Sequence, residues 1–391
     1  MKKKVIKGFI LTFVLTAIVI LLNVNFSNAA KINAKNIEIE AGLNRLMRIE
    51  GIKNVKKVKW SSRNKKIATV SKTGRVKGKK KGETRITARV NGKKYICNVK
   101  VLPKMTDVQR VEKLLKDYGY EEKIDYTDDS CFLWNAKKTK LLGIKIDGAN
   151  FEEDALVGEN KEEFVQLFIK SKYLDLSGFK SLKMIELHCF SIEEINLNGL
   201  TKLKKLKMKA FEPNDDVKFI DFYGVKGMEK LIVSSDQLKS IPYNVLKSLK
   251  YAEVYGKIAD RINLYYLKSA KHLEFSFEAS KKISFPNLSK LETLNIYGEK
   301  KLAEVNISKL KNLKFFNCRS NSTLKKLTIG NLVKLKRLDC YGNGLTYLDL
   351  SGAINLEEIY CRHNKLTELD VRGFTSLVFV ECDSDVNIIR N

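Results

Sequence analysis

The chain has 391 residues and a formal net charge of +28. This length exceeds what one ordinary hydrophobic core supports, so we expect more than one folded unit. With only three His residues and no phosphate-binding glycine loop, Gly-x-Ser-x-Gly or His-Glu-x-x-His motif, the sequence argues against an enzyme. We therefore expect no catalytic site, no metal and no cofactor. The seven Cys residues are an odd number and do not indicate a disulfide framework.

Residues 1–30 have the composition of a secretory signal peptide. A basic start, Met1-Lys2-Lys3-Lys4, precedes an apolar run over residues 8–22 and a small-residue end at Ala29-Ala30. The apolar run is shorter than the roughly 20 residues of a membrane-spanning helix, and no second such run follows. We expect a secreted, extracellular protein associated with the bacterial cell surface, with no integral membrane span after signal cleavage. An uncleaved N-terminal anchor is the alternative.

Residues 31–102 form a strongly basic segment, with 16 Lys and 6 Arg against 4 Glu. Apolar and polar residues alternate here, as in Ile86/Ala88/Val90 and Cys97/Val99/Val101, which is the pattern of half-buried strands. Asn91-Gly92 between these two runs predicts a tight hairpin, because both residue types tolerate a positive φ. Several short strands in about 70 residues predict a small all-β sandwich.

Longer stretches of this segment are specific to one family. They run from Val58 to Gly78 (VKWSSRNKKIATVSKTGRVKG) and from Lys81 to Ala88 (KGETRITA). These stretches resemble the group-2 bacterial Ig-like domain, whose members are spacers or adhesive modules of bacterial surface proteins. The resemblance implies an Ig-like sandwich in which Trp60 is the buried core aromatic residue.

The basic charge of residues 31–102 has two interpretations. One is docking onto an anionic polymer, such as the teichoic acid of a cell wall, or onto an acidic lipid surface. The other is a soluble spacer with a solvated charged face. We expect no nucleic-acid partner, because the chain carries an export signal and no recognition motif. The candidate contacts to an anionic polymer are Lys56, Lys57, Lys59, Lys77, Lys79, Lys80, Lys81, Lys93 and Lys94.

Residues 103–140 are expected to form a helical connector and an N-terminal cap. Pro103 ends the last strand, and Thr106-Asp107 can cap a short helix with apolar residues at helical spacing. A solenoid needs such a cap to cover its open apolar end. The acidic residues 125–129 lack the ligand spacing of a calcium-binding loop and are interpreted as a solvated turn.

Residues 141–391 repeat with a period of 21 or 22 residues over most of their length. The stretch from Leu335 to Leu350 recurs from Leu356 and again from Leu377, and earlier units follow the template L-x-x-L-x-[L/C]-x-x-N-x-L. One unit cannot bury its apolar face alone, whereas stacked units share a continuous core. The units resemble leucine-rich repeats, in particular the internalin-like repeats of bacterial surface proteins. The resemblance implies a β-solenoid with parallel strands on its concave face.

Two columns of the repeat are assigned structural roles. The Asn column, Asn321, Asn343 and Asn364, can satisfy main-chain groups where the chain turns. At position 6, Cys replaces Leu in four consecutive units, which predicts a buried column of free thiols at Cys318, Cys340, Cys361 and Cys382. A linear column of this kind does not converge on one point, so it does not suit zinc.

Positions 3, 5 and 7 of each repeat strand should face the concave surface. Tyr and Arg recur there, and these residue types dominate the energetics of protein interfaces. We expect this face to bind a protein or glycan ligand of unknown identity. The candidate contacts are Tyr251, Tyr255, Tyr297, Phe315, Arg319, Arg337, Tyr341, Tyr360 and Arg362.

Three functional hypotheses follow. The first is an adhesin-like surface protein in which the solenoid binds a partner and the Ig-like domain is a spacer or wall-docking module. The second is a purely structural protein anchored to anionic wall polymer through residues 31–102. The third, an uncharacterised hydrolase, is least favoured because the sequence contains no catalytic cluster.

Overall fold

The computed structural model describes residues 30–51, 58–117, 132–146, 172–188, 192–209, 217–298 and 301–391. The chain divides into two compact units at the peptide bond between Met105 and Thr106. Residues 1–29 of the expected signal peptide, and the candidate contacts Lys56 and Lys57, lie outside the described residues. In the part of the chain that is described, no helix is long and apolar enough to span a membrane.

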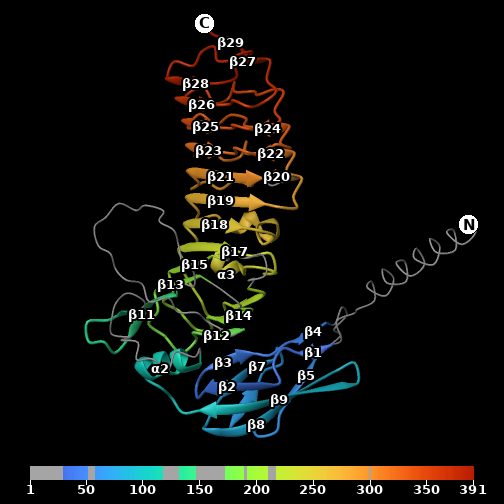
Figure 1. Cartoon of the computed structure of the whole chain (residues 1–391), viewed down its shortest axis with the longest axis vertical. Coiled ribbons are helices and arrows are strands. Elements are labelled where there is room, and N and C mark those ends of the chain that lie inside the picture. The colour runs from blue at the N-terminus through green and yellow to red at the C-terminus, as the bar shows by residue number, and fades with distance from the viewer. Residues whose placement is uncertain are drawn as a thin grey trace, which may run out of the picture. The chain divides into compact units, whose positions relative to one another are not determined.

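The first unit is a β-sandwich (Figure 1). One sheet has the strand order β2-β9-β8-β5 and the other has the order β3-β7-β6, while β1 pairs with β4. The strands are β1 (Lys31–Ile32), β2 (Asn36–Glu40), β3 (Asn44–Leu46), β4 (Ile49–Glu50), β5 (Lys59–Ser62), β6 (Ala68–Val70), β7 (Arg75–Gly78), β8 (Gly82–Val90) and β9 (Lys93–Leu102).

The hairpin predicted at Asn91-Gly92 is confirmed. It joins β8 to β9, with Val90 opposite Lys93 and with φ values of 48° at Asn91 and 75° at Gly92. The alternating strand pattern is also confirmed, because every second residue is buried from Thr84 to Val90 in β8 and from Cys97 to Val101 in β9. The two longest strands of the sandwich therefore follow directly from local sequence signals.

Trp60 is less buried than the family resemblance implied. It packs against the core of the sandwich but keeps partial exposure to solvent. Trp60 is partly exposed because its strand, β5, lies at the edge of the sheet and pairs with β8 alone. The fully buried positions of this core are instead held by aliphatic side chains and one thiol, among them Ile39, Val76, Ile86 and Cys97.

The second unit begins with helix α2 (Asp107–Asp117). Thr106 and Gln109 form a capping box, in which each side chain accepts a hydrogen bond from the main-chain N–H of the other residue. Asp107 is buried, pairs with Arg110 at 2.6 Å and accepts a hydrogen bond from the Leu141 main-chain N–H at 3.0 Å. Asp107 thus ties the helix to the first repeat strands, and the apolar face of the helix joins their core.

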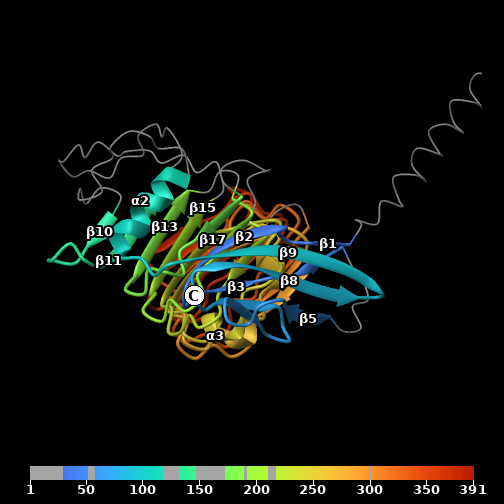
Figure 2. The same cartoon turned by 90° about the horizontal axis from the view of Figure 1, so that it is seen from below.

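A sheet of twelve strands forms the body of the second unit. After the antiparallel pair β10–β11, all of its strands are parallel, and Figure 2 shows β13, β15 and β17 lying side by side along the stack. Its strands are β10 (Phe132–Trp134), β11 (Leu141–Ile146), β13 (Met184–His188), β15 (Lys205–Lys209), β17 (Lys230–Ser234), β18 (Tyr251–Tyr255), β19 (His272–Phe277), β21 (Thr293–Gly298), β23 (Phe315–Asn317), β25 (Arg337–Asp339), β26 (Glu358–Tyr360) and β28 (Phe379–Glu381).

Shorter elements return the chain from one long-sheet strand to the next. The strands among these elements pair with one another in parallel and form three small sheets. The returning elements are β12 (Tyr173–Asp175), β14 (Glu194–Asn196), β16 (Phe219–Asp221), α3 (Tyr243–Leu246), η1 (Ala259–Arg261), η2 (Leu264–Tyr266), β20 (Lys282–Ser284), β22 (Glu304–Asn306), β24 (Lys326–Thr328), β27 (Glu368–Asp370) and β29 (Asn387–Ile389).

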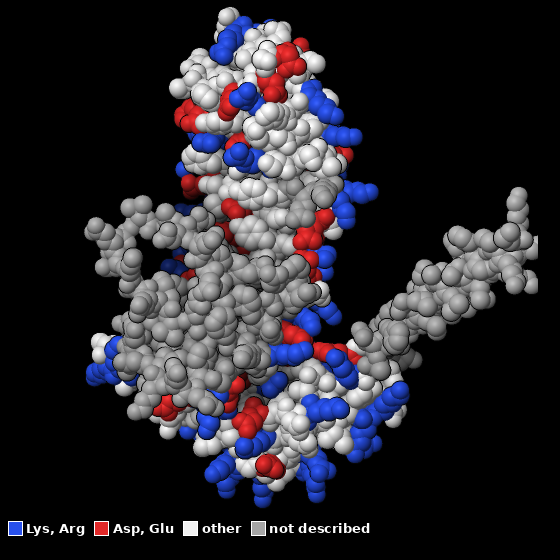
Figure 3. Space-filling view, in the orientation of Figure 1, with Lys and Arg blue, Asp and Glu red and all other residues white. Residues whose placement is uncertain are grey.

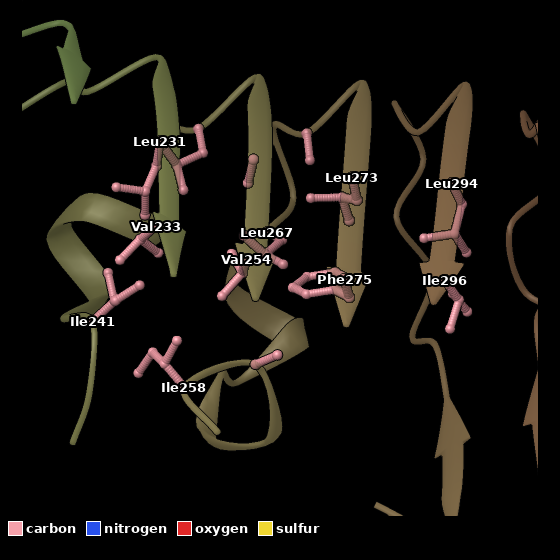
Figure 4. Close-up of a cluster of buried hydrophobic side chains, with 14 of the residues drawn as sticks. Leu231, Val233, Ile241, Val254, Ile258, Leu267, Leu273, Phe275, Leu294 and Ile296 are labelled. Atoms are coloured by element: carbon pink, nitrogen blue, oxygen red, sulfur yellow. The ribbon is translucent and has the colours of Figure 1, made fainter. Parts of the chain in front are cut away.

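The core of this unit follows the repeat template. Position 4 of successive strands stacks Leu231, Leu273 and Leu294 in one row, and position 6 stacks Val233, Val254, Phe275 and Ile296 in the next row (Figure 4). All of these side chains are buried, because alternate residues of a strand point to the same side of the sheet. The predicted fold class, a small Ig-like sandwich followed by a leucine-rich-repeat β-solenoid, is confirmed.

The Asn column has its predicted structural role. Asn343 donates from Nδ2 to the carbonyl oxygens of Cys318 and Cys340, at 3.1 and 2.7 Å, and Asn364 does the same to Cys340 and Cys361. Each of these side chains therefore connects its own repeat to the preceding one. It also satisfies main-chain groups that the short strands leave without a partner.

The Cys column is also placed as predicted, with free thiols at position 6. Cys318, Cys340 and Cys361 are buried, whereas Cys382 in the last unit is partly exposed. Burial raises the pKa of the Cys361 thiol to about 12 and also raises the pKa values of Cys318 and Cys340. These thiols are therefore neutral near pH 7 and fill space in the core as small apolar groups.

Candidate functional site

The predicted binding residues lie on the outward face of the long sheet, which we call the sheet face. Along β18 and β19, buried residues alternate with partly exposed ones, so positions 3, 5 and 7 of each repeat form three parallel columns. Phe315, Arg319, Arg337 and Arg362 are exposed, while the predicted Tyr residues are half-buried. Their neighbours divide them into two clusters along the stack.

The first, the Tyr–Glu cluster, consists of Tyr251, Glu253, Tyr255, His272 and Glu274. Glu253 and Glu274 occupy position 5 of adjacent strands and are in register across the β18–β19 pair. The Tyr251 hydroxyl donates to Glu253, and the Tyr255 hydroxyl lies against both carboxylates. A phenol has one proton, so Tyr255 can donate to only one of the two carboxylates at a time.

Burial and carboxylate neighbours determine the protonation of this cluster. Burial, and then the hydrogen bonds to Glu253 and Glu274, raise the pKa values of Tyr251 and Tyr255, so both phenols stay protonated. Burial lowers the pKa of His272, whose ring stacks on Tyr251 with centroids 4.3 Å apart. A neutral imidazole adds no positive charge, so the two carboxylates leave the cluster anionic.

Two groups from neighbouring strands contact this cluster, one a cation and the other a neutral hydrogen-bond donor. The Lys230 ammonium lies over the Tyr251 ring, 4.2 Å from its centroid, and Asn295 donates from Nδ2 to Glu274 at 2.8 Å. The third predicted residue of this region, Tyr297, is half-buried, and burial raises its pKa as well. Aromatic rings around two carboxylates form a surface that suits a cationic group.

The sequence analysis identified the Tyr residues of this cluster but missed Glu253, His272 and Glu274. The signal was present, because these residues also occupy positions 3 and 5 of their repeats. Selecting Tyr and Arg alone excluded them, since a single exposed carboxylate is ordinary surface charge. Only the register between β18 and β19 shows that the two carboxylates are adjacent.

The second, the Arg–Tyr cluster, consists of Arg319, Arg337, Tyr341, Glu358 and Tyr360. The Arg337 guanidinium lies 4.5 Å from the centre of the Tyr360 ring and forms an ion pair of 3.1 Å with Glu358. Arg319 lies 5.3 Å from the Tyr341 ring centre. The Tyr360 hydroxyl donates a hydrogen bond to Glu358, and this bond is the main cause of the raised pKa of Tyr360.

Its arginines are therefore already engaged within the sheet face. Arg362, at the next strand, is likewise paired with Glu381 at 3.2 Å. Such interactions hold the side chains in defined positions, which reduces the entropy lost when a partner binds. The cluster presents ordered rings and partly neutralised guanidinium groups.

Neither cluster has the arrangement of a metal site. Within the described residues, no group of three or more His, Cys, Asp or Glu side chains is placed to hold a metal ion. The chemistry that the sheet face supports is recognition through rings, carboxylates and guanidinium groups.

The predicted polymer contacts of the first unit fall on two different sheets. Lys59 of β5 faces Arg89 of β8, and Arg89 faces Lys94 of β9, so three cations stand in one row. Lys77 belongs to β7 in the other sheet, and Lys79, Lys80 and Lys81 lie between β7 and β8. All of these side chains are exposed. Arg89, which lies between the predicted contacts Lys59 and Lys94, was not itself among the predicted contacts.

The basic row lies in a unit whose visible charged side chains are mostly basic. Figure 3 shows Lys and Arg side chains gathered along the outer margin of this unit, whereas both signs are interspersed on the visible turns of the solenoid. Like charges in register across strands are destabilising. The charges of Lys59, Arg89 and Lys94 therefore repel one another.

Comparison with solved structures finds several matches. One match is described as the functional domain of InlJ from Listeria monocytogenes, which includes a cysteine ladder. It has 22% sequence identity and a TM-score of 0.45, and the match covers 56% of this chain and 47% of that chain. This chain therefore spans about half the length of that structure. No curated protein matches this chain.

Comparison with protein families finds a match in the first unit. The matched segment contains strands β3 to β8, the Asn91-Gly92 hairpin and most of β9. Residues 43–99 match the family described as bacterial Ig-like domain (group 2), which confirms the resemblance predicted from the stretches around Trp60 and Gly74.

Proposed function

We propose that this chain is a non-enzymatic, adhesin-like protein of the bacterial surface. In this proposal, residues 1–30 direct secretion, residues 31–102 are a spacer or wall-docking module, residues 103–140 cap the solenoid, and residues 141–391 bind a partner. The group-2 bacterial Ig-like match supports the surface location, because such domains are modules of bacterial surface proteins. A rigid stack with an ordered, ring-rich face supports the binding role.

The observation that carries the proposal is the Tyr–Glu cluster. Two carboxylates in register on adjacent strands repel each other, which disfavours this pairing when no cation lies between them. A cationic side chain of a partner would relieve that repulsion and stack on the flanking rings. We therefore propose a protein partner that contributes Arg or Lys at this point; a glycan is the alternative ligand for the same rings.

An array of short peptides that differ in Arg and Lys content tests this proposal with the full chain. Changing Glu253→Gln and Glu274→Gln together should weaken the selected cationic peptides about tenfold, because their charge partner is lost. The matched control is Glu304→Gln with Glu368→Gln, which changes the net charge equally on other strands and should have less than a twofold effect. Equal losses in both variants, or no preference for cationic peptides, would contradict the proposal.

The Arg–Tyr cluster makes a separate contribution to the same face. Tyr341→Ala with Tyr360→Ala removes two rings without changing the net charge, and should also weaken partner binding, by about 2 kcal/mol for truncated interface aromatics. Tyr347→Ala is a suitable control, since Tyr347 is 65% exposed and lies outside the three columns.

A second function is proposed for the first unit, which is docking onto anionic wall polymer. It is supported by the row of cations formed by Lys59, Arg89 and Lys94. The test is retention of the full chain on purified cell walls at low and high salt. Replacing these three residues by Gln should reduce retention at low salt severalfold, and wild-type protein should be released by salt, because exposed charges are screened. Retention that is insensitive to salt and to the three changes would exclude electrostatic docking through this row.

A further inference from the structure

The edge of the long sheet where its strands begin carries a continuous ladder of charged residues, which we call the lysine edge. They occupy position 2 of nine successive repeats, and each main-chain N–H donates to the carbonyl oxygen of the one before. In order along the stack they are Lys183, Lys204, Glu229, Lys250, Lys271, Glu292, Lys314, Lys336 and Glu357. Two lysines and one glutamate thus alternate regularly, which leaves a net charge of +3 on the ladder.

The glutamates pair with some of these lysines. Glu229 lies 3.1 Å from the Lys204 ammonium and 2.7 Å from that of Lys250, and Glu292 lies 2.8 Å from that of Lys314. The hydrogen bond from Lys314 is the main cause of the lowered pKa of Glu292, and the charge of Lys271 adds to it. Glu229 and Glu292 therefore already form ion pairs with lysines of the same edge.

Two further lysines lie near the middle of this stretch: Lys271, which belongs to the lysine edge, and Lys290, which lies beside it, two residues before Glu292. Neither Lys271 nor Lys290 forms an ion pair with a described residue, and both side chains are exposed. Lys271 also follows Lys250 directly in the ladder, so two lysines occupy neighbouring positions of adjacent repeats with no glutamate between them. An edge that served only stability would alternate Lys with Glu, because like charges in register are unfavourable.

The surface is hollowed on both sides of these two lysines. One hollow of about 430 Å³ is lined by Lys204, Gly227, Glu229, Lys247, Ser248, Lys250, Ser269, Lys271 and Lys290. The next, of about 300 Å³, is lined by Lys271, Ser289, Lys290, Glu292, Asn312, Lys314 and Lys334. The two hollows share Lys271 and Lys290 and follow each other along the stack. Together they hold seven lysines and two glutamates.

We propose that the lysine edge binds a linear, flexible polyanion that carries a chain of phosphate groups. Two shallow hollows in line, with cations repeating at the strand spacing, suit many weak contacts along a polymer better than one small anion. The described residues that line the hollows include no aromatic side chain on which bases could stack, which favours a phosphate polymer over single-stranded nucleic acid. This inference is independent of the binding proposed for the sheet face.

Calorimetric titration of the full chain with long-chain inorganic polyphosphate, at several salt concentrations, tests the proposal. Lys271→Gln with Lys290→Gln should weaken binding at least fivefold. It should also lower the slope of log K against log salt by about 1.4, at roughly 0.7 per lost phosphate contact. Lys271→Arg with Lys290→Arg should restore the affinity. Orthophosphate should bind at least a hundredfold more weakly than the polymer.

The matched control is Lys281→Gln with Lys325→Gln. These exposed lysines border the β20–β22–β24 sheet, away from the ladder, and their loss changes the net charge equally. The control variant and Glu253→Gln with Glu274→Gln should both bind polyphosphate within twofold of wild type. Equal weakening in the control and in the Lys271 and Lys290 variant would overturn the proposal. So would stronger binding of heparin, or of single-stranded DNA at equal phosphate concentration, than of polyphosphate.

Discussion

Replacing Asn343 by Ala is expected to lower the free energy of unfolding of the second unit by about 3 kcal/mol. Asn343 is only 7% exposed and bonds three main-chain groups: it donates to the Cys318 and Cys340 carbonyls and accepts from the Asn321 N–H at 2.9 Å. An Ala at this position leaves all three without that partner inside the core. A buried polar group that loses its hydrogen bond costs about 1 to 3 kcal/mol, and some water entry reduces the sum.

Urea denaturation followed by circular dichroism measures this change. Asn355→Ala is the control, because Asn355 bonds only one main-chain group, the Val333 carbonyl at 2.8 Å, and does so on the surface where water can replace it. The control should lose less than about 1 kcal/mol. If both variants lost the same small amount, the Asn column would not connect the repeats as the hydrogen bonds indicate.

Replacing Gly74 by Ala is expected to destabilise the first unit by about 3 kcal/mol or more. Gly74 has a φ of +86°, and an added Cβ would lie 2.4 Å from the Met47 carbonyl oxygen and 2.9 Å from the Trp60 ring. The left-handed backbone alone costs an L-residue about 1 to 2 kcal/mol. The contact with a main-chain oxygen adds to this cost, because the backbone cannot move aside as a flexible side chain can.

Gly92→Ala separates the two contributions. Gly92 has a φ of +75°, yet no atom lies within 4 Å of the added Cβ, so this control should lose only about 1 kcal/mol. Trp60 fluorescence reports unfolding of this unit when Trp134, the other tryptophan of the chain, is changed to Phe. Equal losses for Gly74→Ala and Gly92→Ala would mean that the loop around Gly74 relaxes and that the contact with Met47 has no cost.

The proposed binding surfaces differ in charge, and they should therefore differ in how strongly salt weakens binding. The Ig-like unit and the lysine edge are both basic and would both engage anions, whereas the Tyr–Glu cluster is locally anionic and suits cations. Electrostatic contacts at exposed lysines weaken with salt, because the Debye length is about 8 Å at physiological ionic strength. Salt dependence should therefore be steep for polyanion binding and shallow for the half-buried Tyr–Glu cluster.

The sequence alone determined the architecture of this protein, because its signals are local and periodic. Period-two alternation and Asn91-Gly92 predicted the strands and the hairpin of the sandwich. The period of 21 or 22 residues predicted the stack, and with it the buried columns that contain Asn343 and Cys340. These inferences need no knowledge of distant contacts, since each repeat interacts only with its neighbours.

The tertiary structure alone decided which side chains meet. Strand β2 pairs with β9, about sixty residues later, and β5 is left at the sheet edge, so Trp60 is only partly buried. The pairing of Glu253 with Glu274 and the row that joins Lys59 to Lys94 through Arg89 depend on inter-strand register. A register shift of one residue would move every such side chain to the other face, and composition carries no information on that choice.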